Sequence, residues 1–166
     1  MDELAAAARS PGKVYFTGGA TALLLGFREQ TIDIDLKLDP EPEGVFEAIA
    51  KLKNSLDVNV ELASPADFIP ASANWREQSK FVGKTGPIEF FHFDLTLQAL
   101  SKLERGHEQD LADVNHLLKG AWTTPERIRG VLKQIQPDLL RYPAINEAQF
   151  VGKVEKFLAD YERKLS

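Results

Sequence analysis

The chain has 166 residues, of which 20 are Lys or Arg and 25 are Asp or Glu, so its formal net charge is −5. With 43% hydrophobic and 27% charged residues, the composition is that of an ordinary folded protein rather than a disordered one. It contains no cysteine, which excludes disulfides, thiolate catalysis and metal sites built on cysteine. No apolar run approaches the roughly 18 residues of a membrane span, and the first residues are acidic where a signal peptide would be basic. We therefore expect a cytoplasmic protein without a membrane partner.

The acidic excess is concentrated in the first third of the chain. Residues 1–61 contain six Lys or Arg and eleven Asp or Glu, whereas residues 62–166 contain fourteen of each. Such an excess is typical either of a solvated face or of a cation site, and the order of the residues must distinguish the two.

The N-terminal part of the chain predicts alternating strands and helices. Two segments alternate strictly, as in strands with one buried face. The apolar residues opposite to the polar ones are Ile32, Ile34, Leu36 and Leu38 in the first segment and Val58, Val60 and Leu62 in the second. In chain order we expect helix 1–9, strand 13–17, helix 20–27, strand 31–38, helix 45–56 and strand 57–63.

The remaining chain predicts a hairpin followed by helices. Strands at 79–82 and 87–93 flank a turn at 83–86, and from residue 95 the spacing of apolar residues is helical. The expected helices are 97–105, 107–118, 125–135 and 146–165. The last carries a stripe, interpreted mainly as core packing, that consists of Phe150, Val154, Phe157, Tyr161 and Leu165. We expect an α/β core at 1–94 and a helical region at 95–166, packed on it as one compact unit.

Two possible ligand motifs fail on their spacing. Gly83-Lys84-Thr85 ends like a phosphate-binding P-loop, but residue 78 is not the required glycine and no helix follows. Asp33-x-Asp35 begins like a calcium loop, but the later glycine and glutamate positions do not match.

A glycine pair lies at the junction between the first strand and the helix after it. Gly18 and Gly19 leave backbone N–H groups free to face a phosphate. Asp33 and Asp35 follow, and they project from one side of their strand because residues two apart share a face. Glu61 lies on the polar side of the next strand. If these strands are neighbours, three carboxylates converge near the glycine turn, which suits Mg²⁺ ions that bridge a nucleoside triphosphate. A solvated edge strand is the alternative.

The order of these motifs resembles that of the nucleotidyltransferase superfamily, which has the DNA-polymerase-beta-like fold. The resemblance is carried by Gly18-Gly19, Asp33-Ile34-Asp35 and Val60-Glu61-Leu62. The run Gly18-Gly19-Ala20-Thr21-Ala22, with Arg28 and Thr31, is similar to small bacterial members related to the AbiEii-type toxins of toxin–antitoxin systems. The superfamily's usual Gly-Ser is Gly-Gly here, so Thr21 is considered as the hydroxyl that contacts phosphate.

The resemblance implies an α+β fold, with a nucleotidyltransferase-like mixed β-sheet and flanking helices followed by a helical C-terminal region. It implies transfer of a nucleotidyl group from ATP or another NTP to an acceptor hydroxyl, with release of pyrophosphate. Two Mg²⁺ or Mn²⁺ ions would be held by Asp33, Asp35 and Glu61, and Asp94 is the alternative third carboxylate. The acceptor stays open among a tRNA, a protein and a small molecule, and a cognate antitoxin is a further expected partner.

A second charged cluster lies on the expected C-terminal helices. The resembling branch carries a lysine, an arginine and an acidic helix there, and Lys102, Arg105 and Asp110 match that order. Lys102 would offset the charge of the triphosphate. Asp110 and Asp113, one helical turn apart on one helix face, would orient Lys102 and Arg105 or act on the acceptor. The alternative is a solvated helix with surface ion pairs worth about 0.2–0.5 kcal/mol each. The residues expected to contact the nucleotide are Gly18, Gly19, Thr21, Arg28, Lys102 and Arg105.

Two functions are therefore expected from different classes. The first is a metal-dependent nucleotidyltransferase, and a toxin–antitoxin system is one setting expected for it. The second is a relative that has lost catalysis and binds a nucleotide, or a protein through the stripe on helix 146–165. The missing serine and the open choice of the third carboxylate favour the second function slightly.

Overall fold

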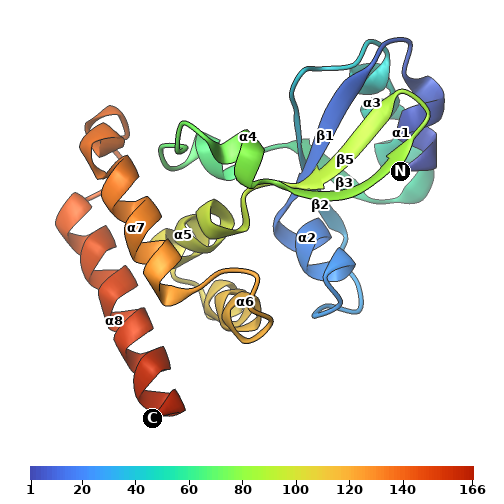
Figure 1. Cartoon of the computed structure of the whole chain (residues 1–166). Coiled ribbons are helices and arrows are strands. Elements are labelled where there is room, and N and C mark those ends of the chain that lie inside the picture. Colours follow the sequence, from blue (N-terminus) through green and yellow to red (C-terminus); the bar gives the residue numbers. More distant parts are fainter. The chain divides into compact units, whose positions relative to one another are not determined.

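A mixed, open sheet of five strands organises the N-terminal half of the chain in this computed structural model (Figure 1). The central strand β1 (Gly12–Thr17) runs antiparallel to β2 (Asp33–Leu38) and parallel to β5 (Ile88–His92). The edges are β3 (Asn59–Leu62), parallel to β2, and β4 (Lys80–Thr85), antiparallel to β5. The strand order is thus β3-β2-β1-β5-β4, and the α+β class predicted from the sequence is confirmed.

The structure describes the backbone of all 166 residues and every side chain except that of Leu56. Contacts divide the described chain into two units: unit 1 contains residues 1–64 and 76–93, and unit 2 contains residues 65–75 and 94–166. The sequence places residues 65–75 in the N-terminal region, whereas the structure groups them with the C-terminal helices. Unit 1 is therefore built from two separate stretches of the chain. The packing of both regions as one compact unit stays a prediction.

One face of the sheet is apolar and packs against α1 (Asp2–Ala7) and α3 (Val45–Leu56). The aromatic rings of Phe16 and Phe90 stack there at a centroid distance of 5.8 Å. The buried side chains of this core include Leu4, Ala5, Val14, Phe16, Leu36, Val45, Ala48, Ile49, Val60, Ile88 and Phe90. The alternation of both segments therefore predicts the buried face correctly at their centres.

The strands are shorter than the alternating segments from which they were predicted. Ile32 is 71% exposed, because Thr31 turns the chain through hydrogen bonds with the backbone of Asp33, where β2 begins. Leu62, the last residue of β3, is also exposed. The predicted burial of Ile32 and Leu62 is therefore wrong, because alternation at the ends of a strand does not ensure that another element covers the residue.

The hairpin of β4 and β5 is present, but its turn lies elsewhere than predicted. Gly83, Lys84 and Thr85 belong to β4, and the tip is formed by Gly86 and Pro87. Gly86 has a φ of +54°, which a residue with a side chain rarely adopts. The tight turn therefore uses this glycine, and the P-loop-like residues are strand residues.

Four long helices form most of unit 2: α5 (Leu95–Arg105), α6 (Glu108–Lys119), α7 (Pro125–Ile135) and α8 (Glu147–Leu165). The short elements are η1 (Pro65–Asp67), η2 (Gln136–Arg141) and α4 (Trp75–Gln78), which crosses from unit 2 into unit 1. Side chains of Asp94, Thr124 and Asn146 cap α5, α7 and α8. Because Asp94 caps α5, this helix begins two residues before its expected start at residue 97.

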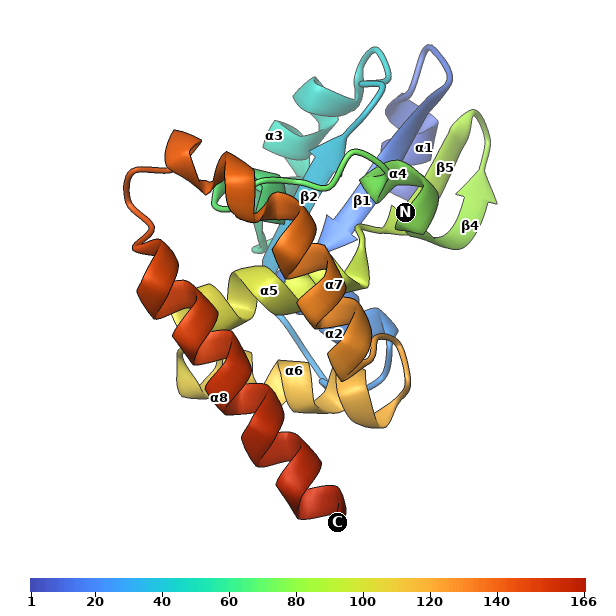
Figure 2. The same cartoon turned by 60° about the vertical axis from the view of Figure 1, so that its left-hand side comes forward.

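The apolar stripe of α8 is only partly buried. Phe150, Val154 and Leu158, at steps of four residues, form its buried side, while Leu165 is exposed. Helices α7 and α8 lie side by side (Figure 2), and Arg129 of α7 forms ion pairs with Glu155 and Glu162 of α8. The predicted core role is confirmed for the N-terminal half of the stripe. None of the helices in the described part of the chain is both long and apolar enough to cross a membrane.

His92 is a buried titratable group at the end of β5. Its Nδ1 lies 3.2 Å from Oγ1 of Thr21, whose hydroxyl donates to the carbonyl oxygen of Phe16. Burial, and secondarily the positive charge of Lys80, lower the pKa of His92 to about 4. The folded protein therefore holds this imidazole neutral in a pH range where the unfolded chain protonates it.

The first prediction concerns this histidine. Because the folded-state pKa is depressed, His92 contributes stability that is present above pH 6.5 and is lost as the pH falls toward 4, by about 3 kcal/mol. Between pH 6.5 and 4, the unfolding free energy of the wild type should therefore fall by about 3 kcal/mol more than that of His92→Gln, as measured by urea denaturation. His116→Gln, at an exposed histidine of α6, serves as the control. Parallel stability curves for the wild type and His92→Gln would contradict the prediction.

Candidate functional site

The glycine pair after β1 packs directly against β2. Helix α2 (Gly18–Leu24) starts at this pair, two residues before its expected start and, with seven residues, shorter than expected. Gly18 has a φ of +55°, and a Cβ there would lie 2.7 Å from Oδ2 of Asp35. A Cβ on Gly19 would collide with Oγ1 of Thr31 and lie 3.2 Å from the carbonyl oxygen of Asp33. Two residues without side chains are therefore needed for this approach.

The three predicted carboxylates lie on one face of the sheet, on neighbouring strands. In the parallel pairing of β2 and β3, Asp35 lies opposite Glu61 and Asp33 lies opposite Asn59. Paired residues and residues two apart share a face, so these four polar side chains are adjacent. We call Asp33, Asp35 and Glu61 the carboxylate cluster. The sequence condition for their convergence, that the two strands are neighbours, is met.

Asn59 connects two members of the carboxylate cluster. Its side-chain nitrogen donates to Oδ1 of Asp33 at 3.2 Å and to Oε1 of Glu61 at 3.1 Å. Asp33 and Glu61 are exposed, and Asp35 is half-buried beneath the glycine turn. The amide donors offset part of the repulsion between like charges on neighbouring strands.

The carboxylate cluster matches the donor type that a hard divalent cation requires. Mg²⁺ binds carboxylate oxygens and usually keeps several waters, so one or two protein ligands per ion suffice. Among the described residues, no three His, Asp or Glu side chains are gathered closely enough to enclose a metal ion. The assignment of Asp33, Asp35 and Glu61 as cation ligands therefore rests on donor chemistry, on register and on the cradle at Gly18.

The other nucleotide contacts expected in unit 1 have different surroundings. Thr21 is buried, and its hydroxyl donates to the carbonyl oxygen of Phe16 and lies within hydrogen-bond distance of the ring of His92. It therefore does not present a free hydroxyl in place of the missing serine. Arg28 follows α2 and is half-buried.

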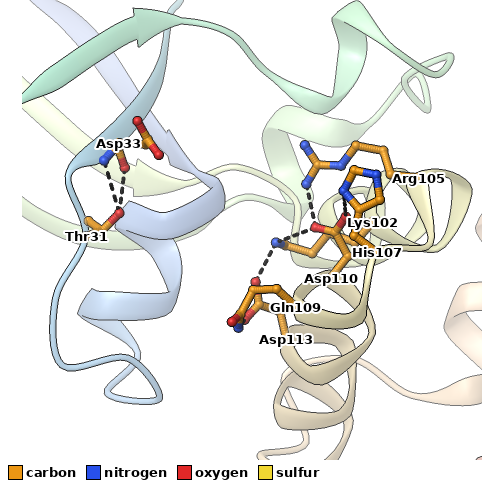
Figure 3. Close-up of polar contacts among 8 residues, drawn as sticks. All are labelled: Thr31, Asp33, Lys102, Arg105, His107, Gln109, Asp110 and Asp113. Atoms are coloured by element: carbon orange, nitrogen blue, oxygen red, sulfur yellow. Dashed lines mark hydrogen bonds and ion pairs between the residues drawn. The ribbon is translucent and has the colours of Figure 1, made fainter.

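A buried ion-pair cluster joins α5 and α6 in unit 2 (Figure 3). Nζ of Lys102 lies 2.6 Å from Oδ2 of Asp113 and 3.5 Å from Oδ1 of Asp110. A second cation, Arg105, binds Oδ1 of Asp110 at 2.6 Å, and Gln109 donates to Oδ1 of Asp113 at 3.2 Å. We call these five residues the lysine cluster. Its two cations and two carboxylates give it no net formal charge.

The lysine cluster is not a solvated surface. The side chains of Lys102 and Asp113 are 8% and 1% exposed, so their ion pair is shielded from water. Breaking one partner of a buried pair leaves an uncompensated charge, which costs far more than a surface pair is worth. The surface alternative considered from the sequence is therefore wrong for Lys102 and Asp110, while Arg105 is about half exposed.

Asp94, the alternative third carboxylate, has a structural role at the start of α5. Its Oδ1 accepts hydrogen bonds from the backbone N–H groups of Thr96 and Leu97 at 2.8 and 3.2 Å. Burial raises the pKa of Asp94 above its usual value, while these two hydrogen bonds act in the opposite direction. The cap uses Oδ1 alone, and Oδ2 is buried without a hydrogen-bond partner among the described residues. The register neighbour of Asp35 is Glu61.

Sequence reasoning assigned no role to Asn59 and Gln109, which the structure places in these clusters, whereas it did expect Asp113 to orient the lysine and the arginine. Asn59 had a visible signal, since it lies two residues before Glu61 on the polar side of the same strand. Asp113 lies one helical turn after Asp110, and Gln109 one turn before Asp113, so both share the helix face of the expected acid. The ion pairs that select Asp113 as the main partner of Lys102 come from tertiary packing.

Comparison with known protein families, with curated proteins and with solved structures gives no match to this chain.

The second prediction tests the close approach of the glycine turn. Gly19→Ala should lower the free energy of unfolding by about 1–3 kcal/mol, because the new methyl group overlaps Thr31. Combined with Thr31→Ala it should cost at least about 1 kcal/mol less than the sum of the single changes, measured in a double-mutant cycle. Gly152→Ala in α8, where a Cβ has open space, should cost nothing. Strict additivity would contradict the close approach.

The third prediction concerns the buried ammonium. Lys102→Met should lower the free energy of unfolding by about 3–5 kcal/mol, because Asp113 then stays buried without its cation, while Asp110 keeps Arg105. Lys156→Met, at an exposed position of α8, should change it by less than about 0.5 kcal/mol. Chemical denaturation at pH 7 measures both. A loss below about 1 kcal/mol at Lys102 would show that the ammonium is not committed to this ion pair.

Proposed function

We propose that this protein is a metal-dependent nucleotidyltransferase, which moves a nucleotidyl group from a nucleoside triphosphate to an acceptor hydroxyl and releases pyrophosphate. The observation that carries the proposal is the meeting of the glycine turn with the carboxylate cluster: Gly18 approaches Asp35 so closely that a Cβ would not fit, and Asp35 pairs in register with Glu61. The alternative of an edge strand does not apply to Asp33 and Asp35, because β2 lies between β1 and β3. Solvation of a strand face also does not require a glycine packed onto a carboxylate.

The finer fold assignment belongs to the same proposal. The nucleotidyltransferase-like arrangement is supported by the strand order of the mixed sheet. The strand with two carboxylates, β2, lies between β1, which is followed by the two glycines, and β3, which carries the third carboxylate. This order brings the three sequence motifs of the resemblance to one sheet face. The resemblance rests on those motifs and on this topology.

Each candidate site residue of unit 1 then has a chemical role. The backbone N–H groups of Gly18 and Gly19 would hold the β- and γ-phosphates, and Asp33 and Asp35 would bind both cations. Glu61 would bind one of them and accept the proton of the acceptor hydroxyl. Bound divalent cations would supply neutralisation of the triphosphate charge and activation of that hydroxyl.

Lys102 is the proposed cation for the leaving pyrophosphate. In the structure its ammonium binds Asp113 and Asp110, so a phosphate contact would have to replace these ion pairs. Arg105 would then still pair with Asp110, whereas Asp113 would lose its cation.

The occupied ammonium of Lys102 also favours a second candidate function. A relative that has lost catalysis would keep the nucleotide-facing turn and use the lysine cluster only to join α5 to α6. Such a protein would bind a nucleoside triphosphate with Mg²⁺ and release no pyrophosphate. Thermal shifts with each NTP, followed by product analysis, separate the two functions.

The fourth prediction tests the enzyme. Asp33→Asn combined with Asp35→Asn should abolish Mg²⁺-dependent transfer of label from α-³²P NTPs, offered with tRNA, protein extract or an aminoglycoside as the acceptor, because the cation ligands are lost. The matched control is Glu41→Gln combined with Glu43→Gln, which removes the same charge at exposed positions nearby in the sequence. It should transfer label like the wild type. Activity that persists in the Asp33 and Asp35 variant would reject the mechanism.

A further inference from the structure

Asn59 occupies a distinctive position within the carboxylate cluster. It lies directly opposite Asp33 in the pairing of β2 with β3, and two residues before Glu61 on the same face of β3. From this geometry we propose that Asn59 is the positioning residue of the cation site. Its amide donates hydrogen bonds to Asp33 and Glu61 when no cation is bound, and these hydrogen bonds are replaced when a cation binds the two carboxylates. The inference rests on the proposed function.

The two hydrogen bonds use the full donor capacity of the amide. A side-chain amide nitrogen has two hydrogens, and here one is directed to Oδ1 of Asp33 and the other to Oε1 of Glu61, at 3.2 and 3.1 Å. One neutral group thus links a carboxylate on β2 to a carboxylate on β3. None of the carboxylates themselves can make this link, because an ionised carboxylate only accepts hydrogen bonds.

The neutrality of the amide matters as much as its hydrogens. The carboxylate cluster carries three formal negative charges on two adjacent strands, where like charges destabilise the pairing. An aspartate at position 59 would have almost the same shape, would bring a fourth negative charge and would donate no hydrogen bond. The asparagine therefore limits the repulsion that the sheet has to tolerate without a cation.

A divalent cation would compete with the amide for the same oxygens. Mg²⁺ binds carboxylate oxygens directly, and so it would replace the hydrogen bonds from Asn59 as the group that offsets the negative charge. The amide also has a carbonyl oxygen, which becomes available when the side chain turns over. Loss of the amide donors should therefore make the stability of unit 1 depend more strongly on divalent cations.

The experiment measures melting temperatures of Asn59→Asp and Asn59→Ala, in EDTA and in 5 mM MgCl₂ without nucleotide. In EDTA, Asn59→Asp should melt about 3–6 °C below the wild type. Mg²⁺ should restore most of that difference, whereas NaCl of equal ionic strength should restore only a minor part, because screening does not replace ligation. Asn59→Ala should also gain more from Mg²⁺ than the wild type does. Asn54→Asp, an exposed asparagine on α3, is the matched control and should show no extra response to Mg²⁺.

The outcomes separate this inference from the proposed function. Equal Mg²⁺ shifts in the wild type and both Asn59 variants would overturn the positioning role, as would equal rescue of Asn59→Asp by NaCl and MgCl₂. Specific rescue by Mg²⁺ in a protein that transfers no nucleotide would support the positioning role and reject the proposed reaction.

Discussion

The close packing of the turn between β1 and α2 against β2 is the constraint on which the candidate site depends. Gly18 and Gly19 have no space for side chains, because Asp35, Thr31 and the backbone of Asp33 fill the adjacent volume. The same contact lies beside the antiparallel pairing in which Thr17 opposes Asp35. The glycines therefore bring the backbone of this turn and the carboxylate of Asp35 to the same place, which neither strand pairing nor helix propensity requires.

The sheet separates two kinds of chemistry across its thickness. Ile34, Leu36 and Val60 face the core formed with α1 and α3, while Asp33, Asp35 and Glu61 project from the opposite face. Burial on one face fixes the register, since a slip of one residue would move every carboxylate into the core. Hydrophobic burial therefore determines where the negative charge lies. Part of the acidic excess of the first third of the chain is on the sheet face opposite to the core.

The lysine cluster of unit 2 differs from the carboxylate cluster because its charges are mostly buried and balanced. Lys102 and Asp113 are buried and form an ion pair with each other, and Arg105 with Asp110 extends the arrangement toward solvent. Such a cluster joins α5 to α6 firmly, yet it also keeps a cation and carboxylates in a defined geometry. Its structural importance is independent of any reaction, and stability measurements on Lys102 therefore have to accompany activity measurements.

The sequence by itself determined the α+β class, the main strands and helices and the faces of β2 and β3, because alternation and helical spacing are local signals of burial. It also identified Asp33, Asp35 and Glu61 as residues of one polar face. It could not determine that residues 65–75 group with unit 2, that the hairpin turns at Gly86, or that the hydroxyl of Thr21 is buried against Phe16 and His92. Nor could it show that Asn59 links two carboxylates or that Asp113 holds Lys102. Only the tertiary structure decided these points, because hydrogen bonds and ion pairs between distant residues depend on strand pairing and helix packing, which no local pattern encodes.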